Sequence, residues 1–282
     1  MILQYPADVA GLTLRVLESG SGDDNVVLLH GVGARADRWR ENLGPLSDAG
    51  LHLFALDLPG HGFSTSDPAI DYSAPGFADV VGQFVVDRLG GGPVVLIGTS
   101  LGGHVAARLT LAHPELVSAA VLVGPTGMRP LGPERRAAVA TGIVDASLEG
   151  TRAKLTWLVH DSALVTDEWV LEEHRINSSR GTHAAIERLA AYFRYRIDDD
   201  ALDPAELERL ASTVPLLFVW GADDTIVPPS EADVLRRHMT DVRILTVPEA
   251  GHAPYFEVPA AFNETVEAFI RDVRGERREP VA

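Results

Sequence analysis

The sequence predicts an α/β fold, a doubly wound and mostly parallel sheet interrupted by a helical insertion. Short apolar runs alternate with helix-like segments in both halves of the chain. Most of these runs are apolar at every position, as expected for parallel strands that helices cover on both faces. The alternation stops between residues 124 and 212, where charge-rich, helix-like stretches follow one another. One α/β core with an insertion of about 85 residues explains this pattern, since insertions at sheet ends are tolerated.

Six apolar runs are expected to form the main strands of the sheet. They span residues 26–29, 51–56, 94–97, 119–123, 216–220 and 242–247. The first strands, near residues 12–17, alternate between apolar and polar side chains, which predicts an antiparallel edge. Core helices are predicted over residues 75–89, 101–112, 229–238 and 259–273. Helices of the insertion are predicted over residues 133–148, 151–160, 167–178 and 183–195.

Length and composition are consistent with one core and one insertion. The chain has 282 residues, 46% hydrophobic and 23% charged, which favours a packed core and excludes global disorder. We expect a core of residues 1–125 and 213–275 and an insertion of residues 126–212. The charged, aperiodic residues 276–282 are expected to form a disordered tail. No signal peptide or membrane-spanning run is visible, so we expect a soluble, cytoplasmic protein.

The charge and the absence of cysteine exclude several kinds of partner and site. The formal net charge is −16, and such a surface repels phosphate backbones and anionic lipids, so neither nucleic acid nor a membrane is an expected partner. The absence of cysteine excludes disulfides, thiolate metal sites and a cysteine nucleophile. We expect a small-molecule substrate, no metal and no cofactor. The oligomeric state stays open.

A serine stands in a glycine-rich segment between a predicted strand and a predicted helix. The segment reads Gly98-Thr-Ser-Leu-Gly-Gly103 and directly follows the strand at 94–97. In a sharp strand-to-helix turn the hydroxyl of Ser100 would be exposed in a strained backbone, and glycines are needed where flanking side chains would collide. The N-terminal amides of the helix would point at a developing oxyanion. The pattern predicts a nucleophile at Ser100, and a plain tight turn is the alternative.

A serine hydroxyl is a weak nucleophile unless a base accepts its proton and a third group orients that base. Asp224 and His252 each follow a predicted strand, so both side chains are expected at the same edge of the sheet. The chain order of Ser100, Asp224 and His252 is that of one known type of catalytic triad. Asp223 competes with Asp224, because a capping aspartate is also expected there. We assign the acid to Asp224.

An oxyanion hole needs two backbone N–H donors close to the nucleophile. The segment His30-Gly-Val-Gly33 ends the strand at 26–29 and supplies a turn beside the serine. The candidate donors are the backbone N–H groups of Val32 and Leu101. Three other histidines are interpreted as structural side chains: His30, His61 and His104.

Five segments together resemble those of the α/β-hydrolase superfamily. They are His30-Gly-Val-Gly33, Asp57-Leu-Pro-Gly-His-Gly-Phe-Ser64, Gly98-Thr-Ser-Leu-Gly-Gly103, Trp220-Gly-Ala-Asp-Asp224 and Gly251-His-Ala-Pro254. The resemblance covers nearly the whole chain outside the insertion. It implies that the insertion is a helical cap that closes over the catalytic serine, and that no cofactor takes part.

The resemblance also narrows the reaction. Ser100 separates the chain from haloalkane dehalogenases and epoxide hydrolases, which carry Asp at that place. The chain is similar to the meta-cleavage-product hydrolases, which split a carbon–carbon bond in ring-fission products. By that resemblance Arg175 corresponds to a cap arginine that holds a substrate carboxylate; an arginine that is solvated or paired with Glu172 is the alternative. The chain departs from that subgroup at three places: Thr99 replaces Asn, Ala253 replaces Trp, and Ala34-Arg35 replace Pro-Gly.

Three hypotheses about function follow from the sequence. The first is a cofactor-independent serine hydrolase that acts on carboxylic esters or lactones through Ser100, His252, Asp224 and an acyl-enzyme. The second is a carbon–carbon bond hydrolase of the meta-cleavage-product type. The third belongs to another class, a ligand-binding protein on the same fold with slow or absent turnover. The complete set of Ser, His and Asp favours an enzyme, since a binding protein has no need of all three.

Overall fold

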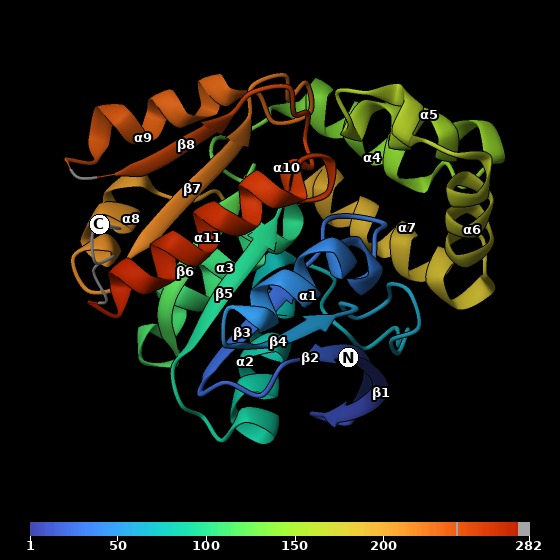
Figure 1. Ribbon diagram of the computed structural model, residues 1–282. Helices are drawn as coiled ribbons and strands as arrows, with labels where there is room; N and C mark the ends of the chain where they lie inside the picture. The colour runs from blue at the N-terminus through green and yellow to red at the C-terminus, as the bar shows by residue number, and fades with distance from the viewer. Residues whose placement is uncertain (241, 276–282) are drawn as a thin grey trace.

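The computed structural model describes residues 1–240 and 242–275, and within them an eight-stranded sheet forms the centre of the molecule (Figure 1). The strand order is β1-β2-β4-β3-β5-β6-β7-β8. Strand β2 pairs antiparallel with β1 and β4, and the remaining pairs are parallel. This confirms the predicted α/β sheet and its antiparallel edge. The tail predicted for residues 276–282 lies outside the described residues.

The strands agree closely with the predicted apolar runs: four of the six runs are extended by one or two residues, the run at 51–56 is unchanged, and the strand predicted at 242–247 begins one residue later. They are β1 (Ile2–Val9), β2 (Leu12–Ser19), β3 (Asp24–Leu29), β4 (Leu51–Leu56), β5 (Val94–Thr99), β6 (Val117–Val123), β7 (Leu216–Gly221) and β8 (Arg243–Val247). Every residue of β5 and β7 is buried, as expected for strands with helices on both faces. These two strands lead directly to Ser100 and to the segment with Asp224.

Helices cover both faces of the sheet and divide the buried apolar side chains into two clusters. On one face lie α1 (Arg40–Asp48) and α11 (Pro259–Val273), in front of the sheet in Figure 1. On the other lie α2 (Ala74–Leu89), α3 (Leu101–Ala112), α8 (Pro204–Ala211) and α9 (Ala232–His238). The short elements are η1 (Ala36–Trp39), η2 (Pro114–Leu116), η4 (Pro229–Glu231) and α10 (Pro254–Glu257). Within the described residues no helix has both the length and the apolar composition needed to cross a membrane.

The segment between β6 and β7 forms a helical layer beyond the carboxyl ends of the central strands, at the right of Figure 1. We call its elements the cap: α4 (Pro133–Val144), α5 (Leu148–Leu158), η3 (Ser162–Leu164), α6 (Asp167–Asn177) and α7 (Arg180–Tyr195). Within the cap, α4 packs on α7 and α5 on α6. Helix α8 falls inside the predicted 126–212 insertion, but it packs against α3 and α9 of the core.

The turn from β5 to α3 brings backbone segments into closer contact than side chains would allow. A β-carbon on Gly98 would overlap the carbonyl oxygen of Gly102, and one on Gly102 would overlap the carbonyl oxygen of Leu29. Ser100 itself adopts φ 55° and ψ −118°, a region that non-glycine residues rarely occupy. Glycine at 98 and 102 is therefore a requirement of the fold at this place.

We expect Gly98→Ala to lower the free energy of unfolding by about 1–3 kcal/mol or more, because the new methyl group forces β5 and α3 apart. Chemical denaturation measures the change. The matched control is Gly44→Ala in α1, where an added β-carbon has no neighbour within 4 Å. That substitution should be neutral or stabilising by up to about 1 kcal/mol. Equal effects of the two variants would contradict the argument.

Two of the histidines interpreted as structural are fully enclosed. His104 on α3 donates through Nε2 to the carbonyl oxygen of Asp200 at 2.8 Å, and His61 donates through Nδ1 to that of Pro59 at 3.1 Å. Burial lowers the pKa of each imidazole to about 4. Both side chains are therefore neutral in the folded protein at pH 7.

These two histidines should make folding stability depend on pH between about 6.5 and 4. In that range the unfolded chain binds protons that the folded chain excludes, so stability falls as the pH is lowered, by about 1 kcal/mol per pH unit for each histidine. Urea unfolding at pH 7, 6 and 5 measures the slope. His104→Gln should remove about half of the pH dependence that His61 and His104 contribute together. His113→Gln, at an exposed site, should leave the pH dependence unchanged. An unchanged slope in His104→Gln would contradict the prediction.

Candidate active site

Ser100 is fixed by hydrogen bonds to the neighbouring strand and helix. Its N–H donates to the carbonyl oxygen of Val123 on β6 at 2.9 Å, and its carbonyl oxygen accepts from the N–H groups of His104 and Thr126. Its side chain borders a cavity of about 450 Å³ between the core and the cap. The strained residue is therefore held rigidly at the floor of this cavity.

His252 lies beside the same cavity and contacts Asp224. The side chains of His252 and Asp224 are 4% and 1% exposed, and 2.7 Å separates His252 Nδ1 from Asp224 Oδ2. The other carboxylate oxygen accepts from the N–H groups of Ile226 and Val227, both at 2.9 Å. A carboxylate only accepts, so Nδ1 carries the proton and Nε2 is left to act as a base.

The neighbouring Asp223 has a different partner. Its Oδ2 lies 3.1 Å from Nδ1 of His160, and both side chains are about half exposed. The structure thus brings Asp224, and not Asp223, to His252. The backbone of Gly124 lies close to both Asp224 and His252. Glycine allows this, since a β-carbon at position 124 would press on the carboxylate and on the imidazole.

The segment after β3 borders the cavity with Val32, the first predicted oxyanion donor. His30 donates through Nδ1 to the carbonyl oxygen of Gly31 at 2.7 Å and accepts through Nε2 from the N–H of Leu58. The peptide between Gly31 and Val32 is trans, so the N–H of Val32 points away from the carbonyl that His30 holds. Burial and the neighbouring His61 lower the pKa of His30 well below its ordinary value, which keeps this imidazole neutral.

Leu101 is the second residue predicted to donate to an oxyanion. It is the first residue of α3, and the N–H of a first helical residue has no acceptor within its own helix. The N-terminal end of α3 also carries a partial positive charge that favours an anion nearby. The structure therefore brings both predicted donors to the two turns that meet at Ser100.

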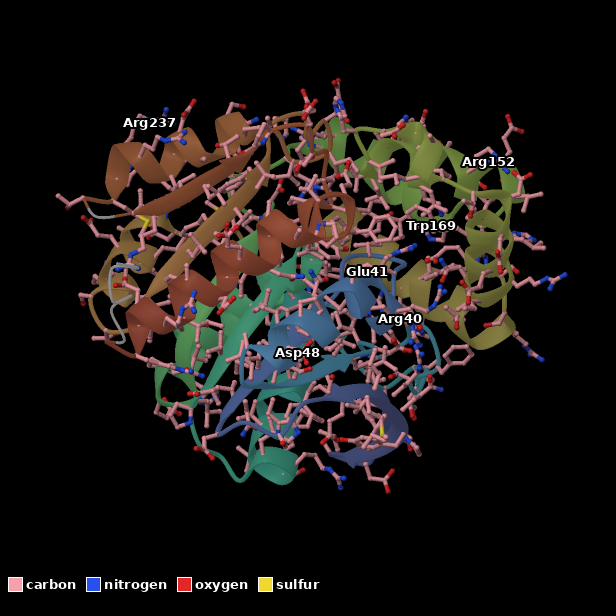
Figure 2. The ribbon with its side chains drawn as sticks, in the orientation of Figure 1. Arg40, Glu41, Asp48, Arg152, Trp169 and Arg237 are labelled. Carbon is pink, nitrogen blue, oxygen red and sulfur yellow. The ribbon has the colours of Figure 1, made fainter. Side chains whose placement is uncertain are left out.

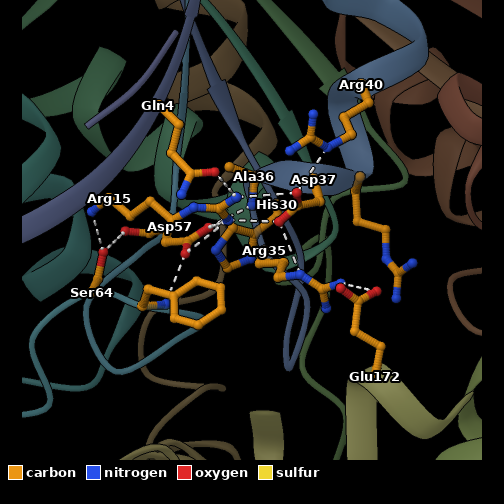
Figure 3. A network of polar contacts seen from close by, with 12 residues as sticks. Gln4, Arg15, His30, Arg35, Ala36, Asp37, Arg40, Asp57, Ser64 and Glu172 are labelled. Atoms are coloured by element: carbon orange, nitrogen blue, oxygen red, sulfur yellow. Dashed lines mark hydrogen bonds and ion pairs between the residues drawn. The ribbon is translucent and has the colours of Figure 1, made fainter. Parts of the chain in front are cut away.

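A network of ion pairs, buried on the side of Arg35 and Glu173 and exposed at Glu172, follows the His30 segment (Figure 3). Arg35 contacts Asp37 in the core and reaches Glu172 and Glu173 of α6 at 2.6 and 2.7 Å. Arg38 donates to Glu173 at 2.9 Å. These contacts join the core to the cap through charged side chains.

The cap also contacts the segment that carries His252. The backbone N–H of His252 donates to the carbonyl oxygen of Leu158, the last residue of α5. The carboxylate of Glu257 accepts from the N–H groups of Gly251 and Ala253 on either side of the histidine, and from the N–H of His160 in the cap. The histidine segment is thus bound to the end of α5.

Residues 26–265 match the sequence model of the alpha/beta hydrolase family. The chain belongs to the α/β-hydrolase family. The strand order, the turn at Ser100 and the contact between Asp224 and His252 agree with the resemblance noted in the sequence.

Two curated relatives illustrate the range of activities near this hydrolase. The 2-hydroxy-6-oxononadienedioate/2-hydroxy-6-oxononatrienedioate hydrolase of Escherichia coli is 31% identical over 276 residues, which cover 93% of this chain and 92% of the relative. The dihydrolipoyllysine-residue acetyltransferase component of the acetoin cleaving system of Cupriavidus necator is 32% identical over 259 residues, which cover 91% of this chain and 66% of that protein. Because these two relatives have such different activities in their names, their similarity does not identify the substrate of this chain.

Solved structures agree on the fold. The 2-hydroxy-6-oxo-6-phenylhexa-2,4-dienoate hydrolase from Rhodococcus sp. strain RHA1 superposes with a TM-score of 0.85 at 22% identity, covering 96% of this chain and 99% of that one. At this identity the likeness concerns the fold alone.

The cap cation suggested by the sequence lies outside the cavity. Arg175 is on α6 with an exposed side chain and is not among the residues that border the cavity. Lys154 on α5 does border it, and burial lowers the pKa of its amine. Its Nζ donates to the backbone carbonyl of Asp145. Sequence reasoning missed Lys154, because nothing in the pattern of α5 separates it from solvated cap charges.

Two further residues at the cavity were also missed. Arg38 and Glu173 border it as a nearly buried ion pair, contributed by the core and by the cap. In the sequence, the only feature that could have indicated a role for this pair is the position of Arg38 shortly after the glycine-rich turn. Among the described residues no cluster of three or more His, Cys, Asp or Glu side chains is arranged to hold a metal ion.

We expect Asp224→Asn to lower kcat by about 10⁴-fold, because an amide no longer fixes the tautomer of His252 or stabilises its charged form. Steady-state kinetics on an activated ester measures the change. The matched control is Asp223→Asn, which removes the contact with the half-exposed His160 and should change kcat by less than about threefold. A larger loss in Asp223→Asn than in Asp224→Asn would reverse the assignment of the acid.

Proposed function

We propose that this hydrolase is a serine hydrolase that works through an acyl-enzyme. Ser100 Oγ attacks the substrate carbonyl while His252 Nε2 takes the hydroxyl proton, and His252 then protonates the leaving group. Asp224 holds the imidazole and stabilises its positive charge. Water hydrolyses the acyl-enzyme by the same proton transfers. The observation that carries this proposal is the 2.7 Å contact of buried Asp224 with His252, beside the cavity that Ser100 also borders.

The negative oxygen of the tetrahedral intermediate would lie between the N–H groups of Val32 and Leu101. Removing a single donor of this kind costs about 3 kcal/mol of transition-state stabilisation in other enzymes. The position of Val32 is supported by His30, which holds the preceding carbonyl in the opposite direction. The position of Leu101 is supported by the rigid start of α3.

The walls of the cavity favour an ester with an apolar acyl or alcohol group. Most of the wall is aliphatic or aromatic, including Met128, Leu131, Ile143, Leu155, Ile186 and Phe193. Two of the basic side chains at the cavity are matched by acids: Arg38 by Glu173, and Arg129 by Glu231 at 2.7 Å. Matched pairs attract a substrate anion weakly, whereas the aliphatic wall gains from burying apolar groups.

One observation favours carbon–carbon bond hydrolysis as the second candidate. The curated relative from Escherichia coli is named as a hydrolase of 2-hydroxy-6-oxononadienedioate, an anionic substrate. Among the described residues Lys154 forms hydrogen bonds with the backbone carbonyl groups of Ile143 and Asp145, whereas the carboxylates of Asp145 and Glu173 act on its charge without direct contact. An amine held in this way at the cavity would suit a substrate carboxylate. In that reading Lys154 takes the role that the resemblance assigns to Arg175.

A substrate series distinguishes the two candidates. We expect kcat/KM on p-nitrophenyl esters to rise from acetate to medium chain lengths, because each methylene group that the cavity buries adds about 0.8 kcal/mol of favourable free energy. A 2-hydroxy-6-oxo-dienoate should be a poorer substrate. A fluorophosphonate probe should label the parent and not Ser100→Ala. A strong preference for the dienoate would establish the second candidate, and no labelling of the parent would favour a ligand-binding protein.

Paired variants test the carboxylate site directly. If the dienoate is the substrate, Lys154→Gln raises its KM markedly and leaves the esters unchanged. The matched control is Arg175→Gln, which removes an exposed cap cation away from the cavity. An effect of Arg175→Gln alone would restore the assignment made by resemblance.

A further inference from the structure

The last residue of α6 contacts the turn that carries the first oxyanion donor. We call residues 31–34 the oxyanion loop. Asn177 donates through Nδ2 to the carbonyl oxygen of Gly33 at 2.8 Å and lies 3.4 Å from Oε1 of Glu173. Asn177 is 6% exposed and borders the cavity. A side chain of the cap therefore binds the backbone of the core directly next to the candidate catalytic centre.

The face of α6 that carries Asn177 also binds the helix to the core. Trp169, Glu173 and Asn177 are spaced four residues apart, so they form one stripe along α6. Glu173 accepts from Arg35 at 2.7 Å and from Arg38 at 2.9 Å. The Arg38 guanidinium lies 4.1 Å from the centre of the Trp169 ring. All three side chains of the stripe thus contact the oxyanion loop or the residues that follow it.

The figures show how this stripe reaches the core. Trp169 lies between α6 and α10 in Figure 2, where its ring is 5.0 Å from that of Phe256, whereas Arg152 projects outward from the cap. In Figure 3 the side chain of Arg35 extends from the core to Glu172. The contact between α6 and the core therefore combines aromatic, ionic and amide interactions.

The oxyanion loop is held from two sides. His30 in the core binds the carbonyl of Gly31, and Asn177 in the cap binds the carbonyl of Gly33. The N–H of Val32 belongs to the first of these peptide groups, and the carbonyl of Gly33 lies two peptide groups further along the chain. Gly33 has φ +68° and no side chain to limit its rotation. Asn177 restrains the loop at this glycine from outside.

We propose that Asn177 is a positioning residue for the oxyanion loop, so that the oxyanion hole is completed only when α6 is docked on the core. This inference rests on the proposed function, since it assigns the Val32 N–H to the oxyanion. It gives the cap a part in stabilising the transition state in addition to enclosing the substrate. A donor that is already oriented stabilises charge without reorganisation, so loss of the contact affects the chemical step more than substrate binding.

The test compares Asn177→Leu, which keeps the branched shape of the side chain and removes the donor, with Asn177→Gln, which retains an amide donor. On a p-nitrophenyl ester we expect Asn177→Leu to lower kcat about 10- to 100-fold with KM changed less than about twofold. Affinity for a boronic acid that forms a tetrahedral adduct on Ser100 should fall by a similar factor. Asn177→Gln should regain part of both losses.

The matched control is Arg196→Ala, which breaks another contact between cap and core, the 3.1 Å pair with Asp71, without touching the oxyanion loop. It should leave kcat and boronate affinity unchanged. Thermal unfolding of each variant checks that the fold is retained.

Hydrogen–deuterium exchange of a peptide that covers residues 31–34 provides a readout that needs no substrate. Exchange should be faster in Asn177→Leu than in the parent and in Arg196→Ala. Unchanged exchange together with unchanged kcat would overturn the inference. If the parent hydrolyses no ester, the proposed function fails, and unchanged exchange in Asn177→Leu then overturns the inference as well.

Discussion

The close approach of β3, β5 and α3 is the constraint on which the site depends. Gly98 and Gly102 allow the backbone to turn so sharply that Gly102 lies against the carbonyl of Leu29, the last residue of β3. The same contact brings Gly31 against the side chain of Ser100. The nucleophile and the oxyanion loop are therefore neighbours because two strands are adjacent in the sheet and because no side chains separate their ends.

The main strands and the motif residues could be predicted from the sequence because their signals are local. A run such as residues 94–97 is apolar on both faces, which indicates a buried strand. The spacing of the glycines that follow it indicates a sharp turn in which side chains would collide. The choice between Asp223 and Asp224 was harder, since either carboxylate could end a strand. Capping bonds from Ile226 and Val227 to Asp224 separate the two, and those bonds depend on the path of the chain after the strand.

The polar face of α6 could not be predicted in the same way. Its sequence is rich in charge, and a charged helix of this kind is usually solvated on every side. Glu173 and Asn177 are buried only because Arg35, Arg38 and the oxyanion loop lie opposite them, and these partners are about 140 residues away in the chain. The family resemblance selected Arg175, whereas the buried contacts belong to its neighbours on the other side of the helix.

Two of the contacts between cap and core lie directly beside the candidate catalytic groups: Asn177 with the oxyanion loop, and the end of α5 with the segment of His252. This arrangement limits which other caps could be placed on the same core. A transplanted cap would need more than a suitable pocket wall, because it would also have to present an acceptor where the carbonyl of Leu158 receives the N–H of His252. Diversification of substrate range in such a protein is therefore expected to concentrate in α4 and in the middle of α5, while the ends of α5 and α6 vary little.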